Sequence, residues 1–376
     1  MTSRPAAPSL TVVRRRFRWR DVLRTFHLWT GLSIGVLFAV LALSGSLLAF
    51  QMPLLRWQHP ELTRYALPTM AQNAVVLERI YQTPWPTPAR NADMPSAELP
   101  VWQLYLGGDV RVYLDPLDGH PLLTRSPQND WLLWLRLLHT HLLGGKTGEQ
   151  VLGVVGVIEL CLLISGAVLW WPRRGHWRNS VRMYAQPPTR RWRSWHQSFG
   201  AVLLPLLLLS TVTGVLLIYK DSARSVLRTV FADHQADFKP PSPLAKQDAP
   251  IRWLDALTAA QAALPQSELR RISLPDAKNA ALLIRARGPN EWNAVGRSTV
   301  VVDPYAGKVI AAYDADQQGT GAHVSDGIYP LHAGAVGGSA WRLVIALIGL
   351  LPAFFVTTGF LFWWTRTRRK RAALPG

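Results

Sequence analysis

The chain has little cysteine and little charge for its 376 residues. Its single cysteine, Cys161, excludes an internal disulfide, a thiolate zinc cage and covalent c-type haem attachment, which needs Cys-x-x-Cys-His. Only 17% of the residues are charged while 49% are hydrophobic, and this balance excludes a disordered chain. Gly-x-Gly-x-x-Gly, Walker A, His-Glu-x-x-His and Gly-x-Ser-x-Gly patterns are also absent. We therefore expect no catalytic side chain of a familiar soluble enzyme.

Four apolar stretches are long enough to cross a bilayer, which takes roughly 20 residues. They lie at 28–55, 151–172, 194–219 and 343–365, and Glu159 is the only acidic residue in them. A helix of a soluble protein is rarely apolar on every face over such a length. The sequence therefore predicts a membrane α-helical protein whose spans are residues 27–50, 150–171, 196–219 and 342–365.

The net charge of +18 is confined to three short segments. Residues 1–26 hold seven arginines and one aspartate, residues 172–195 hold seven arginines, and residues 366–376 hold five basic residues. The remaining 22 basic and 22 acidic residues cancel. Four spans place all three segments on one side, which the positive-inside rule identifies as the cytoplasm. We therefore predict a bacterial inner-membrane protein with both termini cytoplasmic, large periplasmic loops at 51–149 and 220–341, and no nucleic-acid partner.

The two halves of the chain match at fixed offsets from two pairs of histidines. Around His27 and His196 the halves share an arginine, a glycine and a Ser/Thr-Gly pair, and around His139 and His332 they share Gly-Gly, Ser/Thr-Gly and Trp-Trp pairs. The loops match too, because VRVYLDPLDG at 110–119 and TVVVDPYAG at 299–307 both predict a strand that enters an Asp-Pro-x-x-Gly turn. A helix is predicted at 253–264. The fold we expect is a four-span bundle from a duplicated two-span unit, with two periplasmic α+β lobes.

The four matched histidines lie near the ends of the predicted spans. His27 and His196 open spans one and three at the cytoplasmic face, whereas His139 and His332 precede spans two and four at the outer face. Duplicated helices place equivalent residues around a pseudo-twofold axis, so each pair can converge on one point. Two neutral imidazoles that meet across a bundle suit the axial positions of a haem iron. We therefore predict one haem between His27 and His196 and a second between His139 and His332.

Residues one helical turn from the first pair fit other parts of a haem. Gly31 and Gly200 would leave room for a flat macrocycle. Arg24 and Arg193 would pair with its propionates at the membrane interface. We therefore count both arginines among the cofactor-binding residues.

Two further residues leave alternatives open. His141 competes with His139 as a ligand, but residues two apart on a helix point to nearly opposite faces, and the repeat aligns His139 with His332. We therefore choose His139. Glu159 has no acidic counterpart in the other half, and an intramembrane carboxyl group can serve proton uptake or a hydrogen bond between helices.

These motifs resemble the PepSY-associated transmembrane family, also called iron-regulated membrane proteins. The resemblance rests on RTFHLWTG at 24–31, RSWHQSFG at 193–200, LHTHLLGG at 138–145 and LHAGAVGG at 331–338, together with the Ser/Thr-Gly pairs and the outer Asp-Pro-x-x-Gly hairpins. It covers nearly the whole chain. Within the family the chain looks most like inner-membrane ferrisiderophore reductases of the ferrioxamine-reducing kind.

The resemblance implies two haem b groups and one-electron reduction of a ferric siderophore, of hydroxamate type, on the periplasmic side. Reduction suits iron release because hard hydroxamate oxygens hold Fe(III) far more tightly than Fe(II). The electron donor, a quinol or a cytoplasmic reductase, is not identified by the sequence. Two other functions are alternatives: a non-enzymatic PepSY-type binding or regulatory protein, and a siderophore transporter.

Overall fold

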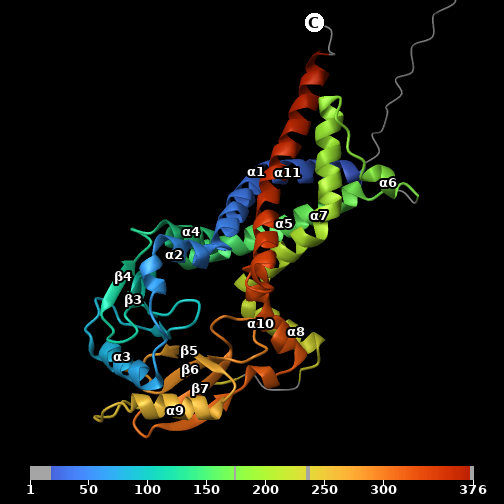
Figure 1. Cartoon of the computed structure of the whole chain (residues 1–376). Coiled ribbons are helices and arrows are strands. Elements are labelled where there is room, and N and C mark those ends of the chain that lie inside the picture. Colours follow the sequence, from blue (N-terminus) through green and yellow to red (C-terminus); the bar gives the residue numbers. More distant parts are fainter. Residues whose placement is uncertain (1–17, 173–174, 234–237, 373–376) are drawn as a thin grey trace, which may run out of the picture.

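The structure is a computed structural model, and it describes residues 18–172, 175–233 and 238–372. Residues 1–17 of the predicted N-terminal basic segment lie outside the described residues, as do 173–174 of the basic connection and 373–376 of the tail. The described chain forms an elongated helical bundle with a separate sheet domain at one end (Figure 1).

Within the described residues, four helices are long and apolar enough to cross a membrane, as predicted. They are α1 (Trp19–Leu48), α5 (Gly145–Trp170), α7 (Pro188–Ile218) and α11 (Gly338–Ala372). The first begins eight residues before His27, so this histidine lies two turns inside a helix instead of at its start. The prediction of a membrane-helical protein therefore agrees with the structure, with longer helices than the apolar runs alone suggested.

The four long helices pack in the ring order α1, α11, α7, α5, so that each contacts two neighbours. Successive spans run in opposite directions, and the chain enters and leaves the bundle at the same end. We call this end, formed by the start of α1, residues 172–195 and the end of α11, the basic end; the other is the sheet end (Figure 1). Helices α1 and α7 thus lie diagonally across the ring, as do α5 and α11.

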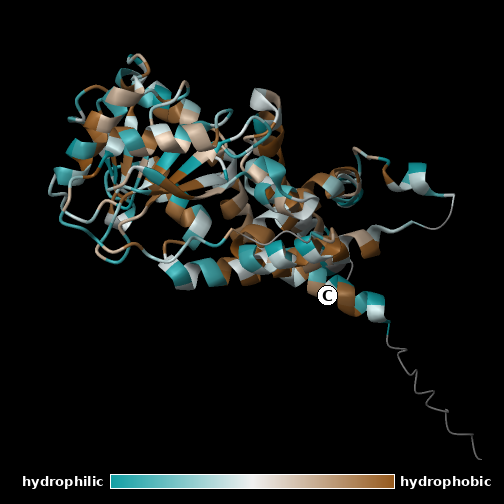
Figure 2. Ribbon diagram, turned by 90° about the horizontal axis from the view of Figure 1, so that it is seen from below, coloured by the Kyte–Doolittle hydropathy of each residue, from teal (hydrophilic) through white to brown (hydrophobic). Residues whose placement is uncertain are grey.

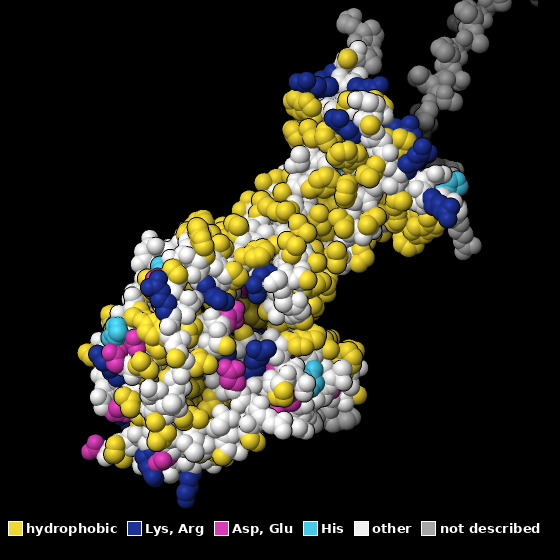
Figure 3. All heavy atoms as spheres, in the orientation of Figure 1, with side chains coloured by type: hydrophobic (Ala, Val, Ile, Leu, Met, Phe, Trp, Pro, Cys, Tyr) yellow, Lys and Arg dark blue, Asp and Glu magenta, His cyan; other side chains and the backbone are white. Residues whose placement is uncertain are grey.

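The surface of the bundle suits contact with lipid. Large apolar side chains point outward along all four helices, among them Val40, Val154, Val202 and Leu347. Hydrophobic residues follow the bundle helices, as Figure 2 shows. In Figure 3 a hydrophobic band separates arginines at the basic end from side chains of both charges on the sheet domain. This distribution is what a membrane-spanning segment requires.

The sheet domain contains an eight-stranded antiparallel sheet in the order β4-β3-β2-β1-β5-β6-β7-β8. Its strands are β1 (Asn91–Asp93), β2 (Trp102–Tyr105), β3 (Arg111–Leu114), β4 (Pro121–Arg125), β5 (Glu268–Ser273), β6 (Leu282–Arg287), β7 (Ser298–Asp303) and β8 (Lys308–Tyr313). Each expected lobe therefore contributes four strands. The lobes are not separate sheets, because β1 pairs with β5 and joins them, with Ala92 opposite Ile272.

Shorter helices cover the sheet or connect it to the bundle. They are α2 (Gln51–Gln58), α3 (Met70–Gln82), α4 (Trp131–His141), α6 (Trp177–Ser180), α8 (Lys220–Val230), α9 (Trp253–Ala263) and α10 (Thr320–His332), with 3-10 turns η1 (Pro60–Thr63), η2 (Gly107–Asp109) and η3 (Ala315–Gln317). Helices α3 and α9 pack side by side and share a hydrophobic core with the sheet. Helix α9 matches the helix predicted at 253–264.

The two Asp-Pro-x-x-Gly motifs form the predicted turns. Asp115 accepts hydrogen bonds from the backbone N–H groups of the turn after β3, and Asp303 does the same after β7. Gly119 and Gly307 close these turns with positive φ angles of 73° and 65°, which glycine adopts without strain. Equivalent hairpins thus form in both halves of the sheet.

Candidate functional site

The four matched histidines lie in two pairs inside the bundle. His27 on α1 and His196 on α7 have ring centroids 6.2 Å apart, toward the basic end. His139 on α4 and His332 on α10 have centroids 6.3 Å apart, toward the sheet end. The rings of the first pair are nearly perpendicular at 88°, and those of the second are inclined at 35°. The structure therefore brings together both pairs that the sequence predicted.

Every one of the four rings is held by a hydroxyl group on a neighbouring long helix. His27 Nδ1 lies 2.8 Å from Ser165 Oγ and His196 Nδ1 lies 3.0 Å from Thr358 Oγ1. Within the second pair, the Nδ1 atoms lie 3.0 Å from the hydroxyl oxygens of Ser44 and Thr213. These hydroxyls belong to the Ser/Thr-Gly pairs that the sequence repeats. Sequence reasoning recorded the pairs but gave them no role.

The hydroxyl groups also fix which ring nitrogen carries the proton. Each donates its own proton to a backbone carbonyl of its helix, as Ser165 does to Leu162 at 2.7 Å and Thr213 to Leu209 at 2.7 Å. Ser44 and Thr358 do the same. A hydroxyl whose proton is used in this way accepts from the imidazole, and this hydrogen-bond pattern assigns the ring proton to Nδ1. The lone pair is then on Nε2, as a metal ligand requires.

The glycine of each Ser/Thr-Gly pair lets the ring approach the helix. A methyl group added at Gly45 would lie 2.8 Å from His139 Cε1, and one at Gly166 would lie 3.0 Å from His27 Cε1. The distance is 3.1 Å at Gly214 and 3.6 Å at Gly359. These glycines of the Ser/Thr-Gly pairs are the ones next to the imidazoles. Gly31 and Gly200 face Leu162 and Phe355 instead.

The spacing of each pair fits two imidazoles that share one metal ion. A metal–imidazole bond is about 2.0–2.1 Å long and the nitrogen lies roughly 1 Å from the ring centroid, so shared ligands have centroids roughly 6 Å apart. The observed 6.2 and 6.3 Å agree with this value. In the described part of the chain, the hydrogen bonds to these rings involve Nδ1 and leave Nε2 available. The residues present therefore suit an axial histidine pair.

His139 and His141 face different surroundings, as the helical spacing predicted. The ring of His139 is directed into the bundle, where its Nδ1 also lies 2.9 Å from the carbonyl oxygen of Leu41 on α1. His141 instead bonds with Thr140 and lines a small cavity of about 240 Å³ together with Asp109 and residues at the start of α5. Of the two histidines, His139 is thus the one placed opposite His332.

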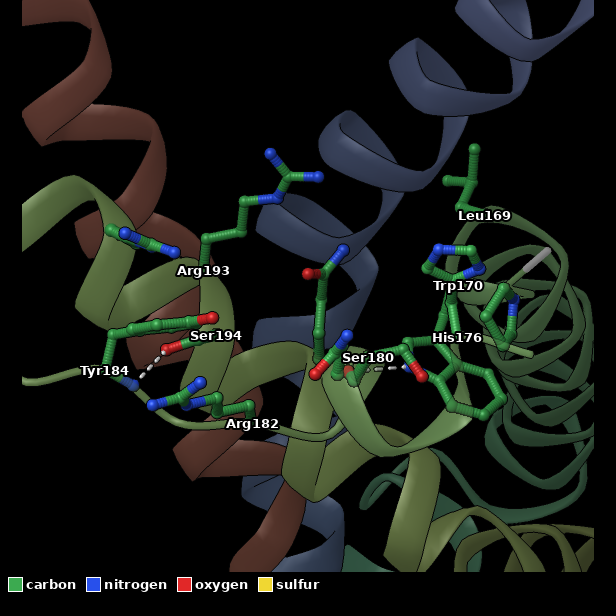
Figure 4. Close-up of a pocket in the computed structure, with 12 residues that line it drawn as sticks. Leu169, Trp170, His176, Ser180, Arg182, Tyr184, Arg193 and Ser194 are labelled. Atoms are coloured by element: carbon green, nitrogen blue, oxygen red, sulfur yellow. Dashed lines mark hydrogen bonds between the residues drawn. The ribbon is translucent and has the colours of Figure 1, made fainter. Parts of the chain in front are cut away.

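The two predicted arginines have different environments. Arg24 is well exposed and pairs with Asp21 at 3.1 Å. Arg193 lines a cavity of about 530 Å³ at the basic end, between the end of α5, helix α6 and the start of α7. Trp170, Arg182, Tyr184 and nearby polar residues complete its wall (Figure 4).

A third arginine stands at the same position relative to a histidine and was missed by sequence reasoning. Arg136 precedes His139 by three residues, as Arg24 precedes His27 and Arg193 precedes His196. Burial lowers the pKa of the Arg136 guanidinium, and the positive charge of Arg111 lowers it further. Among the described residues no carboxylate forms an ion pair with Arg136. The repeated three-residue spacing between arginine and histidine is the signal that could have identified Arg136 from the sequence.

Helix α4, which carries His139, is fixed to the sheet by a buried ion pair. Asp130 accepts the N-terminal hydrogen bond of α4 from Leu133 at 2.9 Å and binds Arg125 of β4 through both carboxylate oxygens, at 2.7 and 2.8 Å. Burial opposes the charge on Asp130, but the hydrogen bonds from Arg125 and Leu133 outweigh it and lower the pKa of the carboxyl group. The His139/His332 pair is therefore linked directly to the sheet domain.

Two other polar groups are not part of either pair. Glu159 is buried on α5, six residues from Ser165, and its Oε2 has no hydrogen-bond partner within the described chain. Asp115, Asp118 and His120 lie close enough to suggest a cation site. They are engaged in the hairpin turn, where Asp118 bonds with His120 at 2.6 Å, and two of them are exposed. This cluster is explained by the turn.

The fold and the site define a multi-pass membrane protein with histidine pairs inside its helical bundle. The chain belongs to the family defined by the PepSY-associated TM region, whose model matches residues 24–366. No curated protein matches the chain. The family suggested by the repeated His, Gly and Trp motifs is therefore confirmed.

Proposed function

We propose that this protein is a dihaem oxidoreductase of the inner membrane that passes electrons across the bilayer and reduces a ferric siderophore in the periplasm. The observation that carries the proposal is that the four histidines meet in two pairs and that each ring contacts a Ser or Thr hydroxyl group through Nδ1. Where each Nδ1 donates to its hydroxyl, Nε2 is left unprotonated for a metal ion, and the ring centroids of the pairs lie 6.2 and 6.3 Å apart, as two ligands of one metal ion would. When bound, haem supplies an iron that changes oxidation state by one electron.

The residues of the chain have separate tasks in this proposal. His27 and His196 would hold one haem b, and His139 and His332 would hold the other. Arg193 would pair with a propionate of the first group, and Arg136 would do so for the second, because its half-buried charge needs an anionic partner. Arg24 remains a propionate partner only if it exchanges its exposed contact with Asp21. Apolar side chains around the pairs limit the access of water.

The orientation follows from the charge. The basic end holds the excess of arginine and lysine, and we infer that it faces the cytoplasm and that the sheet domain lies in the periplasm. We also infer that the halves arose by duplication, because equivalent histidines contact equivalent Ser/Thr-Gly pairs. Electrons would then enter at the His27/His196 pair and leave at the His139/His332 pair, beneath the sheet.

The substrate would meet the protein between the bundle and the sheet domain. Figure 3 shows a hollow there, with basic and acidic side chains at its margin. A ferric hydroxamate held at this place would be released after reduction, because its hard oxygen ligands bind Fe(II) weakly.

Of the two alternatives, transport has less support. Midplane sites of transporters are commonly built by discontinuous helices, whereas α7 and α11 continue through Pro205 and Pro352. A binding or regulatory protein would use the sheet domain without any metal in the bundle. Absorption spectra separate this alternative from the proposed function.

The test is the spectrum of the purified protein in detergent, with and without dithionite. We expect two b-type haems per chain; a colourless protein would overturn the proposal. His139→Ala and His332→Ala should each remove the same haem, and His27→Ala and His196→Ala the other. His141→Ala is the matched control and should retain both.

Reductase activity needs a separate measurement. The reduced protein should be reoxidised by a ferric hydroxamate chelate but not by the iron-free ligand. Reoxidation at equal rates by both would remove the substrate assignment while leaving electron transfer intact.

A further inference from the structure

We propose that the cavity at the basic end binds a phosphorylated planar aromatic molecule, and that reduced flavin mononucleotide is the ligand of this class that serves as electron donor. The cavity has a volume of about 530 Å³, within the range of roughly 300–1,000 Å³ of small-molecule sites. Its role as the donor site rests on the proposed function, whereas binding of the ligand does not.

The charge of the cavity indicates an anionic ligand. Arg182, Arg190 and Arg193 line it, and the connection from 172 to 195 contains no acidic residue. In the described parts of the chain none of these three arginines forms an ion pair. Guanidinium groups bind phosphate through paired hydrogen bonds, which a single ammonium group does not match. Arg182 and Arg190 have no task at the inner haem, and because both are exposed they can reach a phosphate that enters the cavity from the solvent.

The aromatic groups of the cavity organise these charges and offer a stacking surface. The Cζ atom of Arg190 lies 3.6 Å from the centroid of the Tyr184 ring, and that of Arg182 lies 5.6 Å from it, so Tyr184 holds both cations beside the cavity. Trp170 lies on the opposite side and is fixed by a hydrogen bond from its Nε1 to the carbonyl of Ser180 at 3.2 Å (Figure 4). A planar ring can stack on this indole while its phosphate reaches the arginines.

The cavity adjoins the inner histidine pair but is distinct from it. Neither His27 nor His196 is in its wall. Ser194 and Gln197 in the wall flank His196 in sequence, and Trp170 follows Gly166, which contacts His27, by one turn. A ligand in the cavity is therefore placed next to the metal site that the proposed function assigns to this end.

The chemistry of single-electron transfer favours a flavin over a nicotinamide. A nicotinamide gives up a hydride, whereas a reduced flavin can release its electrons one at a time, as a haem iron accepts them. Oxidation of one reduced flavin releases two electrons and two protons. The two haem irons of the proposed function would each accept one of these electrons, and the protons would pass to the solvent at the basic end.

The experiment measures flavin binding by equilibrium dialysis, with the full chain in phosphatidylcholine nanodiscs. The wild type should bind flavin mononucleotide, and it should bind riboflavin, which lacks the phosphate, far more weakly. The double variant R182Q/R190Q should weaken binding by roughly tenfold or more, because charge-assisted hydrogen bonds to phosphate are lost. The matched control is Arg178→Gln, an exposed arginine of the same connection outside the cavity wall, which should bind as the wild type does.

Binding should persist in His27→Ala, and this separates the cavity from the haem. If His27→Ala loses its haem but still binds the flavin, both proposals stand; if the protein contains no haem at all but binds the flavin, only the donor role fails. Absence of flavin binding, equal binding of riboflavin, or an equal loss in Arg178→Gln would overturn the cavity proposal. Displacement of the flavin by phosphatidylglycerol in the nanodisc would overturn it in favour of a lipid headgroup.

Discussion

The two histidine pairs are held in the same way but carried by different parts of the molecule. Both rings of the inner pair project from the long helices α1 and α7, so the bundle alone determines their spacing. The outer pair projects from the short helices α4 and α10, which follow the edge strands of the sheet. Both pairs are anchored by Ser/Thr hydroxyl groups, but only the His139/His332 pair depends on the position of the sheet domain. Disturbing the sheet domain should affect one pair and spare the other.

The largest expected difference comes from the ion pair that fixes α4. Asp130→Asn keeps a good helix cap but leaves Arg125 buried without its charge partner, which costs about 3–5 kcal/mol. We expect the outer haem to be lost or its spectrum altered while the inner haem is retained. Denaturant titration followed by absorbance checks this order. Asp21→Asn is the control: its ion pair with Arg24 is exposed, and the change should be below about 1 kcal/mol.

Removal of the hydroxyl groups that hold the rings should weaken haem binding to a similar extent in both pairs. Thr213→Val and Ser165→Ala remove the acceptors for His332 and His27, and loss of such a partner typically weakens metal binding by about 10–100-fold. Haem retention during competition with a soluble haem-binding protein measures the change. Ser33→Ala, which removes a hydroxyl bonded only within α1, should leave retention unchanged. Loss at one pair alone would show that only one uses this anchor.

Alanine substitutions of the glycines next to the rings should affect the two pairs differently, because the distance from the added methyl group to the histidine ring differs. Gly45→Ala places a methyl group 2.8 Å from the His139 ring, so the ring must move, whereas Gly359→Ala makes an ordinary contact at 3.6 Å with His196. We expect on the order of tenfold weaker haem retention at the outer pair and little change at the inner pair. Equal retention in both variants would mean that these close contacts do not position the rings.

The smallest expected difference between the two histidine pairs is in their response to acid pH. Because the folded-state pKa of Asp130 is lowered, its contribution to stability is complete above the unfolded value of about 3.9 and is lost as the pH falls through the folded value. Acid titration should therefore release α4, and disturb the outer haem, in a step that Asp130→Asn lacks. An identical acid response of both proteins would assign that step to another carboxyl group.

The spans, the pairing of the histidines and the two hairpins were predictable because each depends on local patterns or on repetition. The apolar runs, and the residues that recur at fixed offsets from His27 and His196, can be recognised without knowing how the helices pack. The role of Ser44 and its equivalents was not predictable, because it depends on how α1 is rotated toward α4 in the folded bundle. The continuous sheet was also hidden: β1 is only three residues long, and its pairing with β5 is a contact between distant parts of the chain.

Because β1 pairs with β5, a single continuous sheet lies between the two strands that precede α4 and α10. Eight strands have seven spacings of about 4.8 Å, so the edge strands β4 and β8 are separated by roughly 34 Å along the sheet. Helices α4 and α10, of 11 and 13 residues, are roughly 16 and 20 Å long, enough together to bring His139 and His332 back to 6.3 Å. The spacing of these two imidazoles is thus linked to the sheet as well as to the hydroxyl groups of α1 and α7 that hold the rings. We therefore expect a molecule that bends or flattens this sheet to alter the spacing of this histidine pair.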